Sequence, residues 1–416
     1  MRSPPIPGTV DRGHVIQLDP TFAIANKLAR AAGVDRFTFN WGLAEIERRY
    51  KAGEKVKIKD LKREFNAIKR TQFPWITESP RDANSQPFAD LARARKNFFD
   101  SCSGKRKGRK IGRPKFRRRG VDDSFYVSND KFKVRQRGKR GVVCLPVIGD
   151  VRMMEPLRWQ GKILSARVFR KADKWFIAIN VETRVERPVH VHAHPIVGID
   201  LGLTTAVMPS HGEPINSPRP LRANLKRLRR AQRRLSRRKK GSKNRNKQRI
   251  KVARVHQRVA NVRKDWGHKT TTTNCRENQT VVIENFPVAF MLKNPRLARA
   301  ASDVGIGMLR SMWAYKAPMY GTTLVVAHRH FPSTQRCQRC GNIKTGDDKL
   351  DLNEREYVCA VCGYVANRDR NAAFNLEQYP RLEGNWDREV PTSTEIVSST
   401  QPATSLVEQA DRGSGN

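Results

Sequence analysis

Acidic residues are scarce in this chain of 416 residues, which carries 39 Asp and Glu against 83 Lys and Arg, for a formal net charge of +44. Long apolar runs are missing as well: no stretch reaches the roughly 18 residues of a membrane-spanning helix. The basic stretches also lack the bulky apolar face of helices that lie in a membrane surface. This charge requires a polyanionic partner, and nucleic acid is favoured over an anionic membrane.

Cysteines are few and unevenly placed. Four of the seven form two CxxC pairs, whereas Cys102, Cys144 and Cys275 occur singly. This pattern suits a reducing compartment and one metal site better than a disulfide scaffold. The first residues, MRSPPIPGTVDRG, contain no apolar stretch of the kind that a secretory signal needs. A cytoplasmic protein is therefore expected.

The two CxxC pairs, CQRC (337–340) and CAVC (359–362), are separated by 18 residues, and each is followed by glycine. Four thiolates at this spacing predict one tetrahedral, structural zinc ion of the ribbon type. The predicted ligands are Cys337, Cys340, Cys359 and Cys362. Because four cysteines leave no open coordination position, catalysis by this zinc is not expected. Two redox CxxC motifs are the alternative, but they would not explain two matched pairs.

The first half of the chain is predicted to combine a small helical bundle with a β domain. Residues 12–18 form a short strand, after which Asp19 and Pro20 are expected to cap and begin a helix. Within residues 20–101, apolar residues recur three times at helical spacing. These stripes are Phe39, Leu43, Ile46 and Tyr50; Ile58, Leu61, Phe65 and Ile68; and Phe88, Leu91, Ala94 and Phe98. Strands of a compact β-barrel follow between about residues 124 and 182.

Two segments concentrate positive charge. Residues 104–120 hold ten Lys or Arg and no acid, and their glycines and proline indicate a loop that meets phosphate. Residues 214–264 hold 21 Lys or Arg and no acid, and their apolar spacing predicts a helical hairpin that breaks at 241–246. A solvated face is the simpler interpretation, but without acids it would repel itself unless an anion lay along it. The residues predicted to contact nucleic acid are Arg113, Lys115, Arg233, Arg234, Arg237, Arg238, Lys239 and Lys240.

Three carboxylates stand at the ends of predicted elements. Asp200 lies in the apolar strand 195–203, Glu284 ends the strand in 280–286, and Asp369 opens a short helix. Singly, each has an ordinary structural role as a cap or a helix-start charge. In an RNase H-like domain the three would meet, and because close carboxylates repel, they would share two Mg²⁺ ions suited to phosphodiester cleavage.

Six motifs occur in the order typical of one family. They are GIDLG (198–202), RRLSRRKKGSKNRNKQR (233–249), VVIENF (281–286), FPSTQRCQRCG (331–341), CAVCGY (359–364) and NRDRNAAFNL (367–376). In these motifs the chain resembles TnpB (OrfB) proteins, the RNA-guided DNA endonucleases of insertion sequences and relatives of type V CRISPR effectors. The resemblance covers roughly residues 12–378 and is strongest from residue 195 onward.

The resemblance implies a multidomain α/β protein. Its expected parts are a β-barrel wedge domain (1–18 and 116–190), a helical recognition domain (19–115), a RuvC-like, RNase H-like nuclease domain (195–332 and 363–379), a zinc ribbon (333–362) and a disordered tail (380–416). The resemblance further implies that Asp200, Glu284 and Asp369 are catalytic acids that bind two Mg²⁺ ions. A transposon-end or CRISPR-like guide RNA would direct cleavage of double-stranded DNA next to a short adjacent motif.

The implied protein is a monomer that binds one RNA, has no membrane partner and works in the prokaryotic cytoplasm, associated with the nucleoid. Two alternatives remain. A guide-dependent repressor that binds DNA without cutting would have lost its acids, yet all three are present. A transposase that acts without RNA would need a helix-turn-helix or another sequence reader, and the sequence predicts none.

Overall fold

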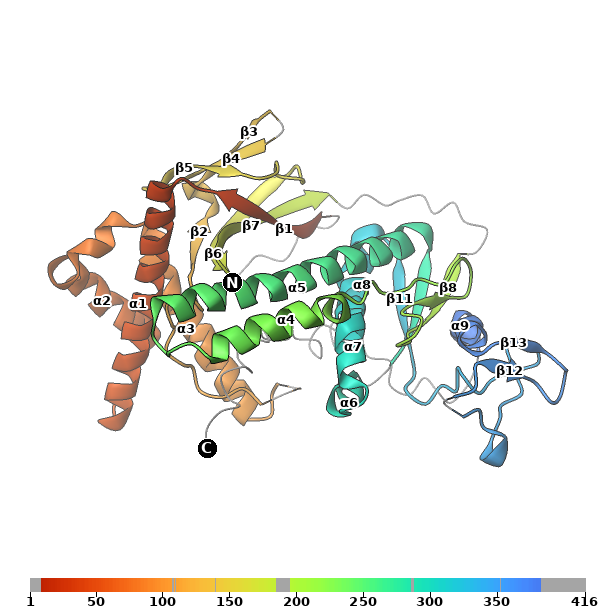
Figure 1. Cartoon of the computed structure of the whole chain (residues 1–416). Helices are drawn as coiled ribbons and strands as arrows, with labels where there is room; N and C mark the ends of the chain where they lie inside the picture. The colour runs from red at the N-terminus through yellow and green to blue at the C-terminus, as the bar shows by residue number, and fades with distance from the viewer. Residues whose placement is uncertain are drawn as a thin grey trace. The chain divides into compact units, whose positions relative to one another are not determined.

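The computed structural model describes residues 9–382 except 107, 109, 139, 185–194, 286–287 and 352 (Figure 1). The chain divides into two compact units, Met1–Arg184 and Val185–Asn416. Among the described helices, none combines the length and the apolar character that crossing a membrane would require. Nearly all of the tail predicted at 380–416 lies outside the described residues.

The first unit contains a seven-stranded antiparallel sheet with the order β2-β6-β7-β1-β5-β4-β3. Its strands are β1 (Thr9–Asp19), β2 (Ser124–Ser128), β3 (Lys133–Arg137), β4 (Arg140–Leu145), β5 (Gly149–Met153), β6 (Lys162–Lys171) and β7 (Lys174–Arg184). Strand β1 is longer than predicted and joins the two halves of the sheet by pairing with both β7 and β5. No pairing of β2 with β3 closes the sheet among the described residues, so the β-barrel stays a prediction.

The helices of this unit are α1 (Phe22–Lys51), α2 (Ile58–Gln72) and α3 (Arg81–Cys102). The predicted cap at Asp19 is wrong, because Thr21 caps α1 and its Oγ1 accepts a hydrogen bond of 3.4 Å from the Ile24 amide. Tyr50 is 71% exposed, so the first apolar stripe ends one turn earlier, at Ile46. Buried residues of all three helices and of the sheet form one continuous hydrophobic core.

The second unit is built on a four-stranded sheet with the order β11-β10-β8-β9. Its strands are β8 (Ile196–Asp200), β9 (Met208–Pro209), β10 (Thr280–Glu284) and β11 (Thr323–Ala327). Strand β10 pairs in parallel with β8 and β11, whereas β9 runs antiparallel to β8. Both faces of the parallel strands are covered, which explains their continuous apolar runs.

Successive residues of β10 point to opposite faces of this sheet. Val281 and Ile283 pack with α8 (Ile306–Tyr320), whereas Val282 packs with Leu376 of α9 (Arg368–Gln378). Helix α9 also lies directly on β8, because a Cβ added to Gly198 would stand only 1.9 Å from the Ala373 carbonyl oxygen. The sheet is therefore held between helices on two faces, as Figure 1 shows for the blue and cyan segments.

A long helical hairpin, α4 (Pro220–Ser236) and α5 (Lys243–Glu277), carries the second basic segment (Figure 1). The break that was predicted at 241–246 lies a few residues earlier, at 237–242, because Ser242 caps α5 by accepting a 3.1 Å hydrogen bond from the Arg245 amide. The buried apolar stripe of the hairpin is thin and contains Leu228, Val255 and Val259.

The start of α4 is fixed by Asp303, the last residue but one of the short helix α7 (Ala298–Val304), which follows α6 (Val288–Lys293). Its carboxylate accepts hydrogen bonds of 2.8 Å from the amides of Leu221 and Arg222. Arg263 of α5 donates to the Asp303 carbonyl at 2.9 Å. Helices α7 and α8 are separated at Gly305, whose φ of 77° is the left-handed conformation that favours glycine.

Replacing Gly198 by alanine should separate α9 from the sheet. The new methyl group would overlap the backbone of α9, which cannot move aside as a side chain can, and we expect a loss of about 3 kcal/mol in the free energy of unfolding. Urea titration of the full chain measures this. Gly307→Ala in α8 is the matched control, because its nearest neighbour is 3.9 Å away, and equal stability of the two variants would contradict the close approach.

Lys316 joins α8 to α5 inside the second unit. Its ammonium group is buried and donates to the His268 carbonyl at 2.7 Å and to the hydroxyls of Thr271 and Thr272 at 2.8 and 2.7 Å. Burial lowers the pKa of Lys316 to about 8, since none of these three partners carries a negative charge.

The lowered pKa of Lys316 predicts a pH-dependent stability. Between pH 8 and about 10.5 the unfolded chain binds the proton that the folded chain has released, so the free energy of unfolding rises with pH by about 3 kcal/mol. Lys316→Met should remove this rise. Urea titrations from pH 7.5 to 10.5 measure the free energy of unfolding of the wild type and of Lys316→Met. If the difference between the two proteins did not change with pH, the prediction would be refuted.

Candidate metal centres and basic surfaces

Asp200 and Glu284 are the last residues of β8 and β10. The two strands pair in parallel, with Ile199 opposite Ile283, so both carboxylates stand at the same edge of the sheet. Asp369 is the second residue of α9, the helix that packs on β8. The structure thus brings the three predicted acids to one region, and their catalytic role stays a prediction.

Electrostatic repulsion links these carboxylates. Burial, followed by the charges of Glu284 and Asp369, raises the pKa of Asp200 well above its usual range, while Arg368 opposes the shift. Burial also raises the pKa of Glu284, with a hydrogen bond from Ser333 acting against it and Asp369 adding to it. A cation bound between such carboxylates would be favoured, because its positive charge offsets their mutual repulsion.

Two arginines flank Asp369 and bind protein groups. The Nε and Nη2 atoms of Arg368 lie 3.3 Å from Asp369 Oδ1, and its Nη1 donates to the Asp351 carbonyl at the same distance. Arg370 donates to the carbonyls of Pro209 and Gly212 at 2.7 and 2.8 Å, next to β9. These contacts fix both the acid and the start of its helix.

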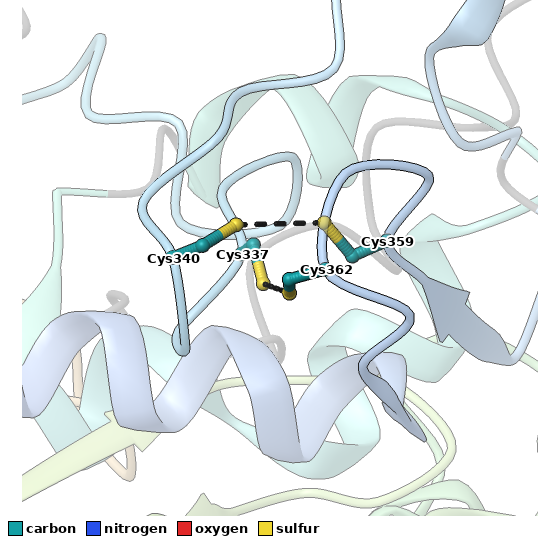
Figure 2. A group of neighbouring side chains, drawn as sticks. All are labelled: Cys337, Cys340, Cys359 and Cys362. Carbon is teal, nitrogen blue, oxygen red and sulfur yellow. Dashed lines mark hydrogen bonds between the residues drawn. The ribbon is translucent and has the colours of Figure 1, made fainter.

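The four cysteines of the CxxC pairs point toward one another from two facing loops (Figure 2). Their sulfurs all lie within 4.8 Å of one another, with 3.7 Å between Cys337 and Cys362 and 3.6 Å between Cys340 and Cys359. Zinc–sulfur bonds of about 2.3 Å in a tetrahedron would place sulfurs about 3.8 Å apart. The cluster therefore fits a zinc ribbon. In the part of the chain that the structure describes, no other set of metal-binding side chains is gathered this closely.

The loops of the ribbon have the local geometry that ligation needs. Gly341 and Gly363 follow the CxxC pairs with φ of 78° and 69°, which permits the tight turns. The amides of Cys337 and Cys359 donate at 2.8 Å to the carbonyls of Asn342 and Tyr364. Strands β12 (Glu356–Val358) and β13 (Val365–Asn367) flank the second CxxC and pair with each other, and β13 leads directly into α9.

Side chains of α9 hold the ribbon in place. Arg336 donates to Asn375 at 2.8 Å and to Gln378 at 2.9 Å, and Asn371 donates back to the Arg336 carbonyl at 2.7 Å. Asn375 also donates at 2.8 Å to the carbonyl of Ser333, the residue whose hydroxyl contacts Glu284. Ribbon and carboxylates are thus connected through one helix. Sequence reasoning missed Ser333, although it lies inside the motif FPSTQRCQRCG.

The residues predicted to contact nucleic acid are all exposed. Arg113 and Lys115 lie in the loop after α3 of the first unit. The others belong to the second unit and lie at the end of α4 and in the turn to α5: Arg233, Arg234, Arg237, Arg238, Lys239 and Lys240. Arg245 closes this turn by donating to the Leu235 and Arg238 carbonyls at 3.0 Å. Their contacts with nucleic acid stay predictions.

Three family models match the chain. The one described as "Probable transposase" covers residues 178–295, and "Cas12f1-like, TNB domain" covers 307–376. A third, described as "Helix-turn-helix domain", covers residues 10–55, where the sequence had predicted no such reader. In the structure these residues contain β1 and the uninterrupted helix α1.

Full-length relatives define the family. A "Putative RNA-guided DNA endonuclease" of Streptomyces pristinaespiralis is 37% identical over 371 residues, which are 88% of this chain and 89% of that protein. The "Putative RNA-guided DNA endonuclease InsQ" of Escherichia coli K12 is 33% identical over 382 residues, or 86% and 90%. This chain belongs to the TnpB (OrfB) family of transposon-associated RNA-guided nucleases, relatives of the type V CRISPR effectors.

The fold agrees with one solved structure of the CRISPR group. The protein in the "Cryo-EM structure of the Cas12f1-sgRNA-target DNA complex" superposes with a TM-score of 0.53 at 14% identity, over 87% of this chain and 83% of that one. At this identity the similarity concerns the fold alone.

Removing zinc should unfold the ribbon. Its own core is small, with Tyr357 as the largest buried side chain, whereas zinc contributes roughly 10–16 kcal/mol in small zinc peptides. In Cys359→Ser we expect the backbone amides of residues 333–367 to lose their protection from hydrogen exchange. Metal analysis should show that the same variant has lost its zinc. Cys102→Ser is the matched control, because that exposed cysteine lies in the other unit. Full protection in zinc-free protein would exclude a structural role for the metal.

Proposed function

We propose that the protein is an RNA-guided, Mg²⁺-dependent DNA endonuclease that cleaves its target next to a short adjacent motif. The observation that carries this proposal is the meeting of Asp200, Glu284 and Asp369 at one edge of a parallel sheet. Family membership supports the same activity, since two full-length relatives bear that name. The alternative of a repressor that does not cut is less favoured, because this centre retains every predicted acid.

We further propose the family's domain plan. The second unit would hold the RuvC-like nuclease domain (195–332 and 363–379) with the zinc ribbon inserted at 333–362. The first unit would hold the β-barrel wedge domain with its helical recognition domain at 19–115. We also propose that the active form is a monomer with one guide RNA, associated with the nucleoid. Fold similarity to a Cas12f1 protein over most of the chain supports this plan.

The carboxylate centre fits two Mg²⁺ ions by its donor chemistry. Mg²⁺ prefers hard oxygen ligands, and burial together with mutual repulsion makes the apo carboxylates reluctant to ionise. When bound, the ions would supply the charge and Lewis acidity for phosphodiester hydrolysis. Ser333 orients Glu284 by its hydrogen bond, and Arg368 holds the Asp369 carboxylate from the ribbon side.

The basic surfaces are proposed to bind the nucleic acids. Guide and target strands form an A-form heteroduplex that proteins of this kind recognise by shape and backbone, while base pairing reads the sequence. The cations at the end of α4 and in the turn before α5 project from a stiff hairpin, which suits them to follow a phosphate backbone. Each neutralised phosphate would release counterions and steepen the salt dependence of binding.

Cleavage of a plasmid that carries a guide-matched site tests the proposal. The protein purified with its RNA should cut in Mg²⁺, and Asp200→Ala should lower the rate by about 100-fold or more, because a metal ligand is lost. Asp265→Ala is the control, since this exposed acid lies on α5 and pairs with Lys269. Wild-type protein that binds the target but fails to cut would favour the repressor.

Thermal unfolding gives the same prediction a second readout. Mg²⁺ should raise the Tm of the wild-type protein, because it binds the folded centre and relieves the repulsion. Asp200→Asn should raise the Tm in the absence of Mg²⁺ and abolish the Mg²⁺-dependent increase. An increase that persists in this variant would place the bound ion elsewhere.

A further inference from the structure

The loop at residues 110–119 of the first unit, here called the basic loop, is fixed to the helices at two points. Near its start, the Ile111 amide donates at 2.9 Å to the hydroxyl of Ser101, on the last turn of α3. Near its end, the side chain of Asn40 on α1 binds both backbone groups of Arg117. The Arg117 amide donates to Asn40 Oδ1 at 2.7 Å, and Asn40 Nδ2 donates to the Arg117 carbonyl at 3.0 Å.

Arg117 differs from the other cations of the basic loop because its guanidinium points into the protein. It donates to Asp35 of α1 and, at 3.1 Å, to Asp90 of α3. The guanidinium carbon also lies 4.0 Å from the centre of the Phe39 ring. The side chain of Arg117 is 17% exposed and that of Asp35 is fully buried, so this cation is used within the fold.

The contacts with Asp35 and Asp90 explain why the side chain of Arg117 should stay inside the protein. Burial raises the pKa of Asp35 to about 7, and Arg117 is the strongest influence acting against that shift. If Arg117 left to follow a phosphate, a buried carboxylate would remain without its main ionic partner, which is strongly unfavourable. Arg167 of β6 contacts Asp90 at 3.2 Å and lowers the pKa of Asp35 less than Arg117 does, so it does not replace Arg117.

The remaining residues of the basic loop present a different chemistry to solvent. Arg113 and Lys115 are exposed, and Phe116, which lies between Lys115 and Arg117, is 48% exposed. Cations beside an open aromatic ring are typical of surfaces that bind phosphates and stack on a base or sugar.

We propose that the basic loop is a preformed binding site for a nucleic-acid backbone, in which Asn40 and Arg117 are positioning residues. Arg113 and Lys115 would contact phosphates, and Phe116 would stack on an adjacent nucleotide. The inference rests on the proposed function and adds different roles for neighbouring cations: Arg117 holds the loop, and Arg113 and Lys115 contact phosphates. Because the loop is already ordered, binding does not have to order its backbone, and the affinity depends on the side chains that hold it.

Asn40→Ala tests the positioning role without changing the charge. Either nucleic acid could supply the phosphates, so two binding assays are needed. One measures binding of the guide RNA to the free protein, and the other measures binding of a target DNA duplex to the RNA-bound protein. In one of these assays we expect Asn40→Ala to bind about 3- to 10-fold more weakly than the wild type. We also expect trypsin to cleave the basic loop of the free variant faster. Asn26→Ala is the matched control, since it makes the same substitution at an exposed site on the same helix.

Salt titrations separate phosphate contacts from positioning. Lys115→Ala should make the fall of log K with log salt less steep by about 0.7–0.9. Between 50 and 200 mM salt the variant should therefore lose about 3-fold less affinity than the wild type. Lys115→Arg should restore the slope. Phe116→Leu should weaken binding and leave the slope unchanged. In the Asn40→Ala background, Lys115→Ala should lose most of its effect, because a misplaced loop no longer presents this cation.

The outcomes distinguish this inference from the function on which it rests. An altered slope in either assay supports the site and identifies the nucleic acid bound. Wild-type binding with no effect of Lys115→Ala in either assay overturns the inference and leaves the proposed nuclease intact. Additive effects of Asn40→Ala and Lys115→Ala overturn the positioning role. Wild-type protein that binds neither nucleic acid overturns both.

Discussion

Helix α9 approaches strand β8 so closely that there is no room for a side chain on Gly198. This packing connects three features of the second unit. It sets the first turn of α9, with Asp369, on the strand that ends in Asp200. It covers one face of the parallel sheet. It also carries the ribbon, because Asn371 and Asn375 of α9 bind the chain just before the first CxxC pair.

Charge is distributed in opposite ways in different parts of this protein. The chain carries 83 Lys and Arg against 39 Asp and Glu, whereas three carboxylates lie close enough at one edge of a sheet to repel one another. Each arrangement is electrostatically unfavourable by itself, and each becomes favourable with a partner of the opposite charge: a polyanion for the cations and divalent ions for the acids. The metal-dependent nuclease that we propose would bring both partners together at one phosphodiester.

Sequence patterns predicted features that depend on local spacing. The CxxC pairs, the break of the basic hairpin at Ser242 and the strands that end in Asp200 and Glu284 were all visible, because cap residues and apolar runs are local signals. The N-cap of α1 was placed wrongly, since Asp19 and Thr21 are both good caps and tertiary pairing extends β1 as far as Asp19.

The direction in which a side chain points in a loop has no such local signal. Arg113 and Arg117 look equivalent within a run of ten cations, yet only Arg117 reaches a buried carboxylate. That distinction depends on Asp35 and Asp90, which come from helices far away along the chain. The same holds for Ser333, whose contact with Glu284 spans 49 residues. In a strongly basic protein, therefore, the cations that organise the fold are recognised by the acids they meet, and those left exposed are the candidates for binding nucleic acid.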